Sequence, residues 1–241
     1  MIWAFIALLA GGILKGATGA GAPIIAVPVI ALLYDVPFAI VMFSFPNLLS
    51  NLWQGWQYRD HQMGEGFTWR FAVAGAIGAG LGTVILANVP SDLLVALVAM
   101  SVFVYIGFRL ARPDWFLPFS LARRIVWPVG TLAGMMQGAG GVSAPVSITF
   151  LNAMKPERAA FVGTVSVFFV AMAAIQIPLL AWYGFLDWHR LGLSLLALLP
   201  ILGGMPIGAA LAKRLSKQVF DRLILTLLAL VALRLLIEVT L

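Results

Sequence analysis

The chain has 241 residues, 62% of them hydrophobic and only 10% charged, whereas a soluble domain carries about 25% charged residues. This composition excludes a water-soluble protein, and the absence of cysteine excludes disulfide bonds, thiolate metal sites and thiol redox chemistry. The net charge of +6 comes from basic residues that flank apolar stretches, which is typical of cytoplasmic loops rather than of a nucleic-acid-binding surface.

The first half of the chain opens with two short apolar arms, residues 2–14 and 24–33, on either side of a glycine-rich segment. Three longer apolar stretches follow, at residues 38–58, 67–87 and 93–110. Stretches of about 17–25 apolar residues have the length of a helix that crosses a bilayer. We therefore predict one broken helix followed by three transmembrane helices.

The second half of the chain repeats this order. Two short arms, residues 125–136 and 146–154, enclose a second glycine-rich segment, and three long stretches follow at residues 159–183, 191–211 and 223–241. The sequence thus predicts an all-α, polytopic membrane protein. The polar connection between the halves divides it into a first repeat, residues 1–112, and a second repeat, residues 113–241.

The two glycine-rich segments align without gaps when Gly12 is placed on Gly134. The matched positions that follow are Gly16, Gly19, Ala22 and Pro23 in the first half, and Gly138, Gly141, Ala144 and Pro145 in the second. Later in each half, GAGLG at residues 78–82 corresponds to GMPIG at residues 204–208. A single small-xxx-small match is common in membrane helices, but an ordered series of matches indicates an internal duplication.

Loop charge predicts that the two repeats have opposite orientations. The loop ANVPSD in the first half has no lysine or arginine, whereas its counterpart AKRLSKQVFDR in the second half is rich in both. Basic loops face the cytoplasm, so these two loops are expected on opposite sides of the membrane. Inverted repeats need an odd number of crossings each, which three full spans and one re-entrant broken helix supply.

The glycine-rich segments are the predicted anion site. Unwound backbone at membrane depth leaves polar groups unpaired, at a cost of several kcal/mol each, unless it packs in protein or lines a wet cavity. Glycine accepts positive φ angles, and Pro23 and Pro145 suit the first turn of a following helix. A helix N-terminus carries roughly half a positive charge. Two broken helices that meet near the midplane would offer such an end to an anion.

Lys15 precedes the first break, and a buried lysine in a membrane marks function by default. Its counterpart in the second repeat is Gln137, and no aspartate or glutamate lies within a full span except Glu238 near the chain end. An anionic ligand would therefore supply the missing partner charge. The candidate substrate-binding residues are Lys15, Thr18, Gly19, Gly21, Asn47, Asn51, Gln137, Gly140, Gly141 and Ser143.

Polar residues of the second element of each repeat could complete the site. Asn47, Asn51 and Gln54 share one helix face, and Thr164, Ser166 and Gln176 are the comparable residues of the second half. Three structural alternatives stay open: the glycine segments as packing kinks, Lys15 reaching an interface, and the asparagine face as helix–helix hydrogen bonding.

The motifs GATGAGAP at residues 16–23 and GAGGVSAP at residues 138–145, each after a short apolar arm, resemble the sulfite exporter TauE/SafE family. The resemblance covers essentially the whole chain. It implies a multi-pass carrier of the bacterial inner membrane for sulfite, sulfonates such as sulfoacetate, or related organic anions. The first motif reads Gly19-Ala20-Gly21-Ala22 in place of the glycine triplet common in the family.

Our leading hypothesis is a secondary carrier for a small sulfur-containing or carboxylate anion, in which one repeat rocks against the other. An inside-negative potential drives each negative charge outward by about 2.3 kcal/mol per 100 mV, so export is favoured and needs no coupling ion. A proton or sodium ion for uptake and a homodimeric state are left open. The alternatives are a passive anion channel or a non-transporting membrane assembly factor. The sequence has no catalytic motif, so neither an enzyme nor a cofactor is predicted.

Overall fold

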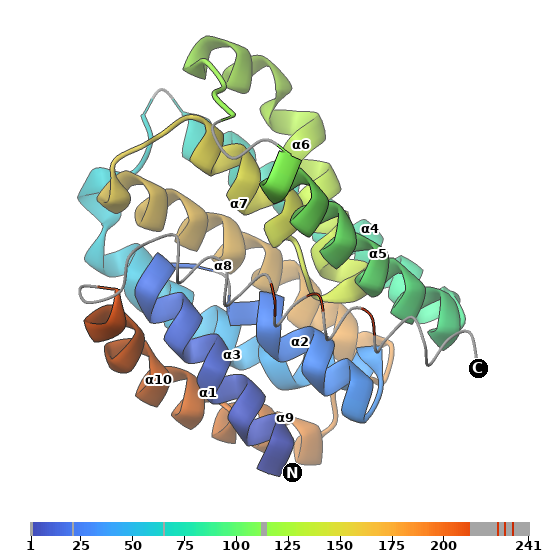
Figure 1. Cartoon of the computed structure of the whole chain (residues 1–241). Helices are drawn as coiled ribbons and strands as arrows, with labels where there is room; N and C mark the ends of the chain where they lie inside the picture. The colour runs from blue at the N-terminus through green and yellow to red at the C-terminus, as the bar shows by residue number, and fades with distance from the viewer. Residues whose placement is uncertain are drawn as a thin grey trace.

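The computed structural model describes residues 2–20, 22–64, 66–111 and 115–212, together with positions 226, 229 and 233. Within these residues the secondary structure is helical (Figure 1), which confirms the predicted all-α class. The helices are α1 Ile2–Thr18, α2 Ala22–Leu33, α3 Val36–Gln57, α4 Phe67–Asn88, α5 Ser91–Ala111, α6 Phe119–Gly140, α7 Ala144–Ala153, α8 Arg158–Trp182, α9 Trp188–Leu196 and α10 Leu198–Leu211, with a short 3-10 turn η1 at Arg59–His61. The predicted span at residues 223–241 lies outside the described residues, apart from three positions.

Five helical stretches of the described chain are long and apolar enough to cross a membrane: Val36–Gln57, Phe67–Asn88, Ser91–Phe108, Arg158–Trp182 and Trp188–Leu211. The last of these is divided at Ala197, where α9 ends and α10 begins. Large apolar side chains such as Ile77 and Met100 are exposed on these helices, as expected of surfaces that face lipid. These features confirm a polytopic membrane protein.

Both predicted breaks are present, but they are shorter than expected. α1 continues to Thr18 and α6 to Gly140, and each helix is followed by a glycine with positive φ, 86° at Gly19 and 70° at Gly141. The glycines before these two positions are therefore helical. The prediction that the whole glycine-rich segment is unwound was wrong, because most of these glycines serve helix packing instead.

Each broken element folds back on itself. A Cβ at Gly11 of α1 would lie 2.8 Å from the carbonyl oxygen of Ala22 in α2, so the two arms run side by side. The amide of Leu117, just before α6, donates to the carbonyl of Ala153 at the end of α7 at 2.8 Å. The α6–α7 element thus begins and ends at the same end of the molecule. The opposite orientation of the two repeats remains a prediction.

Glycines allow α1 to pack closely against α10. A Cβ at Gly12 would overlap the carbonyl oxygen of Ile201, and one at Gly16 would overlap that of Met205. From the other side, Gly208 faces the carbonyl oxygen of Ile13 in the same way. The absence of side chains brings the two backbones into direct contact.

The pair α6 and α4 is built by the same rule. The glycines involved are Gly134 and Gly138 of α6, which face backbone atoms of α4, and Gly78 and Gly82 of α4, which face backbone atoms of α6. The sequence alignment matched these glycines with those of the α1–α10 pair. The first helix of each predicted repeat therefore packs against a helix of the other repeat.

Two hydrophobic clusters follow this pairing. One is formed mainly by residues of α1, α2, α3 and α5, together with Ile201 of α10, and α5 contributes to both clusters. We call the helices α1, α2, α3, α9 and α10, which contact one another, the α1–α10 group. The other cluster is formed mainly by α4, α6, α7 and α8, the α4–α6 group, and contains stacked rings such as Phe71 and Phe168, whose centroids are 3.9 Å apart. Helices α3 and α8 contact each other at the seam between the two groups.

Candidate functional site

Lys15 is buried in the last turn of α1, with only 3% of its surface exposed. Its Nζ donates a hydrogen bond of 2.8 Å to Oδ1 of Asn51 in α3. Among the described residues no carboxylate lies within ion-pair distance of it. The alternative in which this side chain reaches an interface does not match its burial. The lysine is held instead by the oxygen of a neutral amide.

Asn51 also makes hydrogen bonds within α3. Its Nδ2 donates to both the backbone oxygen and the side-chain oxygen of Asn47, at 2.7 Å and 2.8 Å. Both asparagines are buried, as is Gln54 on the same face of the helix. A continuous line of hydrogen bonds therefore runs from Lys15 at the first break to Asn47, which borders a pocket beside the second break.

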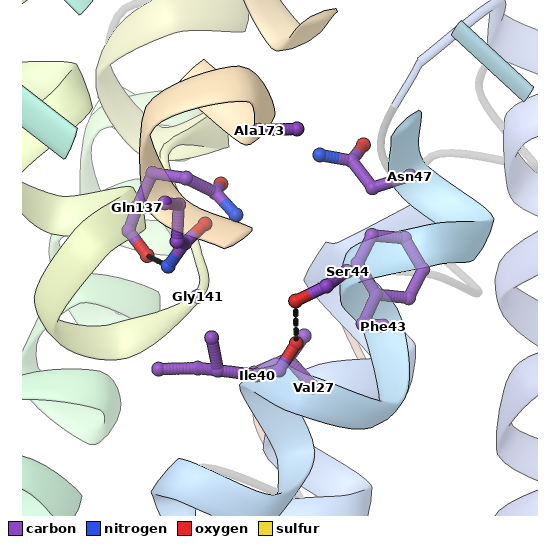
Figure 2. Close-up of a pocket in the computed structure, with 9 residues that line it drawn as sticks. Val27, Ile40, Phe43, Ser44, Asn47, Gln137, Gly141 and Ala173 are labelled. Carbon is purple, nitrogen blue, oxygen red and sulfur yellow. Dashed lines mark hydrogen bonds between the residues drawn. The ribbon is translucent and has the colours of Figure 1, made fainter. Parts of the chain in front are cut away.

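The pocket lies at the seam between the two helix groups (Figure 2). Its lining residues are Val27 from α2, Ile40, Phe43, Ser44 and Asn47 from α3, Gln137 and Gly141 at the end of α6, and Ala173 and Gln176 from α8. The α1–α10 group provides one wall and the α4–α6 group the other. In this conformation the side chains approach so closely that the space is too small for a water molecule.

The two breaks have the same hydrogen-bond geometry. The amide of Gly19 donates to the carbonyl of Lys15 at 2.7 Å, and the amide of Gly141 donates to the carbonyl of Gln137 at 2.8 Å. A glycine with positive φ that closes a helix in this way is a common C-terminal cap. Lys15 and Gln137, which the sequence alignment matched, thus accept the same capping hydrogen bond at the ends of their helices.

This geometry changes the role expected of the glycines. The amides of Gly19 and Gly141 already have acceptors and are not open to a ligand, and Gly140 belongs to the α6 helix. A Cβ at Gly19 would lie 2.5 Å from Cγ2 of Val162, which shows how tightly this position is packed. That these amides bind an oxyanion stays a prediction, and in this conformation both already donate within the helix ends. Gly21 lies outside the described residues.

The hydroxyl groups at the breaks are partly engaged as well. Thr18 Oγ1 donates to the carbonyl of Leu14 at 2.8 Å and contacts the backbone of Ala20, so it stabilises the end of α1. Ser143 is fully buried at the start of α7, where its carbonyl accepts the amides of Val146 and Ser147. Neither Thr18 nor Ser143 lines the pocket.

The walls of the pocket contain polar groups without partners. Oε1 of Gln137 is buried and makes no hydrogen bond, and the same is true of Gln54 Oε1 and Ser166 Oγ on the neighbouring faces of α3 and α8. Nε2 of Gln176 donates to the backbone carbonyl of Gln137, not to its side-chain oxygen, at 3.2 Å. Buried polar groups are normally paired, so these three unpaired atoms are available as hydrogen-bond partners along the seam.

The structure brings together five of the predicted site residues around the pocket and the lysine: Lys15, Asn51, Asn47, Gln137 and Gly141. Two polar lining residues were missing from the candidate set. Gln176 was predicted only as a residue that could complete the site, because it is a polar residue in an apolar helix. Ser44 lies three residues before Asn47, on the same side of α3. The apolar lining gives no sequence signal.

Comparison with known proteins now bears on this site. The family model of the sulfite exporter TauE/SafE matches residues 3–235. The chain belongs to the TauE/SafE family. A search of curated proteins and a search of solved structures each gave no match.

TauE/SafE proteins are membrane transporters and not enzymes, so membership confirms the resemblance drawn from the glycine motifs. It implies transport of sulfite or related small anions across a membrane. A buried lysine that has no carboxylate partner in the described part of the chain is the feature of this TauE/SafE protein that suits a negatively charged substrate.

Proposed function

We propose that the protein is a secondary carrier that binds a small sulfur-containing or carboxylate anion, such as sulfite or a sulfonate, between α3, α6 and α8. The observation that carries this proposal is the burial of Lys15 against a neutral amide. A buried charge is costly unless it is paired, and an anion in the adjoining pocket would pair it. Helix interiors nearby offer no protein carboxylate, since α2, α3 and α10 contain none.

The hydrogen-bond line from Lys15 explains how charge and pocket act together. Asn51 and Asn47 orient the lysine and connect it to the pocket wall. The carboxamides of Asn47 and Gln137 line the pocket (Figure 2) and can donate to the oxygens of a sulfur oxyanion. Gln176 also lines the pocket, where its Nε2 donates to the backbone carbonyl of Gln137. The buried start of α7, at Ser143, adds the positive end of a helix close by. In this view Thr18, Gly19, Gly140 and Gly141 shape the breaks rather than donate to the substrate.

The closed pocket supports alternating access, because a substrate can enter only after the walls separate. The backbones of α1 and α10 touch, and so do those of α4 and α6, so these pairs cannot separate easily. The seam between α3 and α8 is different, since unpaired polar atoms lie along it. We therefore infer that the α1–α10 group moves against the α4–α6 group, rather than residues 1–112 against residues 113–241.

The direction of transport follows from the charge of the substrate. An inside-negative membrane potential favours export of an anion by about 2.3 kcal/mol for each charge and 100 mV. Export therefore needs no coupling ion, whereas uptake would need a proton or sodium ion. Location in a bacterial inner membrane and a homodimeric state stay predictions.

The experiment that tests this function uses the purified protein. A thermal-shift screen against sulfite, thiosulfate, sulfonates and oxoacids should give a saturable increase in melting temperature with at least one anion, since a ligand that binds only the folded state stabilises it. Counterflow of the same labelled anion in proteoliposomes should then saturate. Ion currents without counterflow would instead identify a channel, and the absence of both flux and thermal shift would identify a non-transporting factor.

A further inference from the structure

Helix α3 carries a proline in its interior. Pro46 has no backbone N–H, so the carbonyl of Met42, four residues earlier, loses its usual helical donor. The side chain of Ser194 in α9 fills this gap. Its Oγ donates to the carbonyl of Met42 at 3.1 Å and lies 3.3 Å from the amide nitrogen of Phe45, whose hydrogen it accepts.

Ser194 is the only buried residue of α9, a helix that the structure describes in full. Its fully buried hydroxyl lies among apolar side chains of the α1–α10 group. A buried hydroxyl without partners costs about 1–3 kcal/mol, so serine is a poor choice here unless the hydroxyl is needed. Both of its hydrogen bonds go to the turn of α3 that Pro46 interrupts. The hydroxyl is therefore needed to pair backbone groups of this turn.

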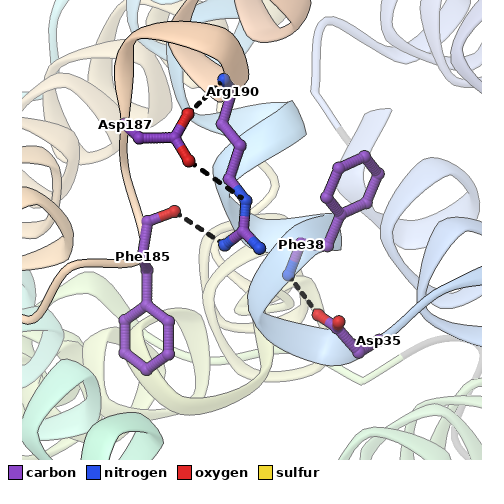
Figure 3. A network of polar contacts seen from close by, with 5 residues as sticks. All are labelled: Asp35, Phe38, Phe185, Asp187 and Arg190. Atoms are coloured by element: carbon purple, nitrogen blue, oxygen red, sulfur yellow. Dashed lines mark hydrogen bonds and ion pairs between the residues drawn. The ribbon is translucent and has the colours of Figure 1, made fainter.

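A second contact holds α9 against α3 near the start of both helices (Figure 3). Asp187 caps α9 by accepting from the amide of Arg190 at 2.7 Å, and Arg190 Nη1 donates to the carbonyl of Phe185 at 2.9 Å. The guanidinium group lies 6.0 Å from the ring centroid of Phe38 in the first turn of α3. Helix α9 is thus fixed to α3 at its first turn and again at Ser194.

Pro46 separates two sets of residues that matter to the pocket. Ile40, Phe43 and Ser44 line it from the turns before the proline, and Asn47 lines it from the residue after. Asn51, one turn further on, holds Lys15. The course of α3 at Pro46 therefore sets how the apolar residues of the pocket wall are oriented relative to Asn47 and Asn51.

We propose that Ser194 is a positioning residue for the pocket, because its hydroxyl completes the hydrogen bonding of α3 at Pro46 and so holds the two parts of the helix in their relative orientation. The consequence for transport rests on the proposed function, whereas the consequence for the shape of the pocket does not. Removal of the hydroxyl should let α3 move and open the closed pocket. Restoration of an N–H at position 46 should make the hydroxyl dispensable.

The test uses a single reporter thiol in this naturally cysteine-free chain. Ala173→Cys places it on the α8 wall of the pocket, and its rate of modification by the anionic reagent 2-sulfonatoethyl methanethiosulfonate measures how often the pocket opens. Added Ser194→Ala should raise this rate about tenfold, which corresponds to loss of one buried hydrogen bond. Ser194→Thr keeps the hydroxyl and should leave the rate within about twofold.

The decisive comparison is the double variant Pro46→Ala/Ser194→Ala, in which the N–H at position 46 can serve the carbonyl of Met42. Its labelling rate should return to within about twofold of the reporter protein. As a matched control, Ser101→Ala removes a hydroxyl that donates to the carbonyl of Val98 in α5 and should not change the rate. An unchanged rate in Ser194→Ala, or the same increase in both Pro46 and Ala backgrounds, overturns the proposal.

Folding failure is also informative. If Ser194→Ala does not fold but the double variant does, the proposal is supported, and if neither folds it is overturned. With labelled sulfite as the probe, Ser194→Ala in the cysteine-free protein should raise the half-saturation concentration for counterflow about tenfold, with a smaller change in maximal rate. If the unmodified protein does not transport sulfite, the proposal that sulfite is a substrate is wrong. The labelling rates still test the role of Ser194 in that case.

Discussion

Nζ of Lys15 and Oδ1 of Asn51 lie 2.8 Å apart, and this hydrogen bond joins the first broken helix to the long helix that borders the pocket. It crosses from α1 to α3 inside the α1–α10 group. Because Asn51 also donates to Asn47, any change at the lysine is passed to the pocket wall. The charge of the site and the shape of the site are therefore linked through one residue.

Loss of the lysine charge should weaken anion binding. Lys15→Met keeps the length of the side chain and removes the only charged group of α1, so the half-saturation concentration for sulfite counterflow should rise about 10- to 100-fold, as expected for a charged hydrogen bond. Lys155→Met, in the exposed turn after α7, is the matched control. Equal kinetics for Lys15→Met and the unmodified protein would remove this residue from the site.

An internal negative charge should compete with the substrate. Asn51→Asp changes one atom and places a carboxylate beside the lysine, where the two groups form an ion pair. We expect a folded protein whose thermal shift with sulfite is lost. Asn51→Gln, which stays neutral, should retain part of the shift. A full sulfite response in Asn51→Asp would show that Lys15 does not face the substrate.

Close packing of α1 on α10 should make Gly16 sensitive to any side chain. Gly16→Ala forces its new Cβ onto the carbonyl of Met205, and overpacking of this kind costs about 1–3 kcal/mol. The melting temperature in detergent should fall by roughly 2–4 °C for each kcal/mol. Gly203→Ala on α10 meets no atom within 4 Å and should melt at the same temperature or slightly higher.

A covalent link across the seam should stop transport. An ideal Cβ at Gly55 lies 3.6 Å from Cβ of Ser166, inside the range of roughly 3.5–4.5 Å that a disulfide needs. The oxidised variant Gly55→Cys/Ser166→Cys should lose counterflow of a labelled sulfonate, which unlike sulfite does not cleave disulfides, and recover it on reduction. Each single-cysteine variant controls for the substitution itself. Undiminished counterflow in the fully oxidised double variant would exclude motion at this part of the α3–α8 seam.

Spin-label distances can distinguish which parts move. Ile6 on α1, Leu202 on α10 and Ile77 on α4 are exposed, so labels there should not disturb packing. Addition of sulfite should change the distance between positions 6 and 77 and leave that between positions 6 and 202 constant. The opposite result would mean that residues 1–112 move as one unit, because positions 6 and 77 belong to the same predicted repeat.

The sequence was sufficient to predict the helices and the family because both depend on strong signals. Long apolar stretches have one stable arrangement in lipid, and a lone lysine among them is conspicuous. The role of the glycines could not be predicted in the same way. A glycine chosen for positive φ, such as Gly141, and one chosen for close packing, such as Gly138, are the same letter in the same motif.

The contribution of Ser194 was beyond prediction for a related reason. A proline such as Pro46 shows from the sequence alone that one helical hydrogen bond is missing. The hydroxyl donor that replaces the missing N–H lies about 150 residues away on another helix, so only the fold reveals it. The pocket as a whole combines α2, α3, α6 and α8. The position of the pocket depends on which glycine-containing helix faces pack against each other. The sequence shows which helices have such faces but not which two helices form a pair.

The contact between α1 and α10 also has a consequence for biosynthesis. Helix α1 is packed against α10, which lies about 185 residues later in the chain, and a chain grows at about 5–20 residues per second during synthesis. About ten seconds or more therefore pass between the synthesis of Gly12 and Gly16 and that of α10, the helix on which they pack. Until α10 has been synthesised, Lys15 lies on a helix that lacks one of its packing partners.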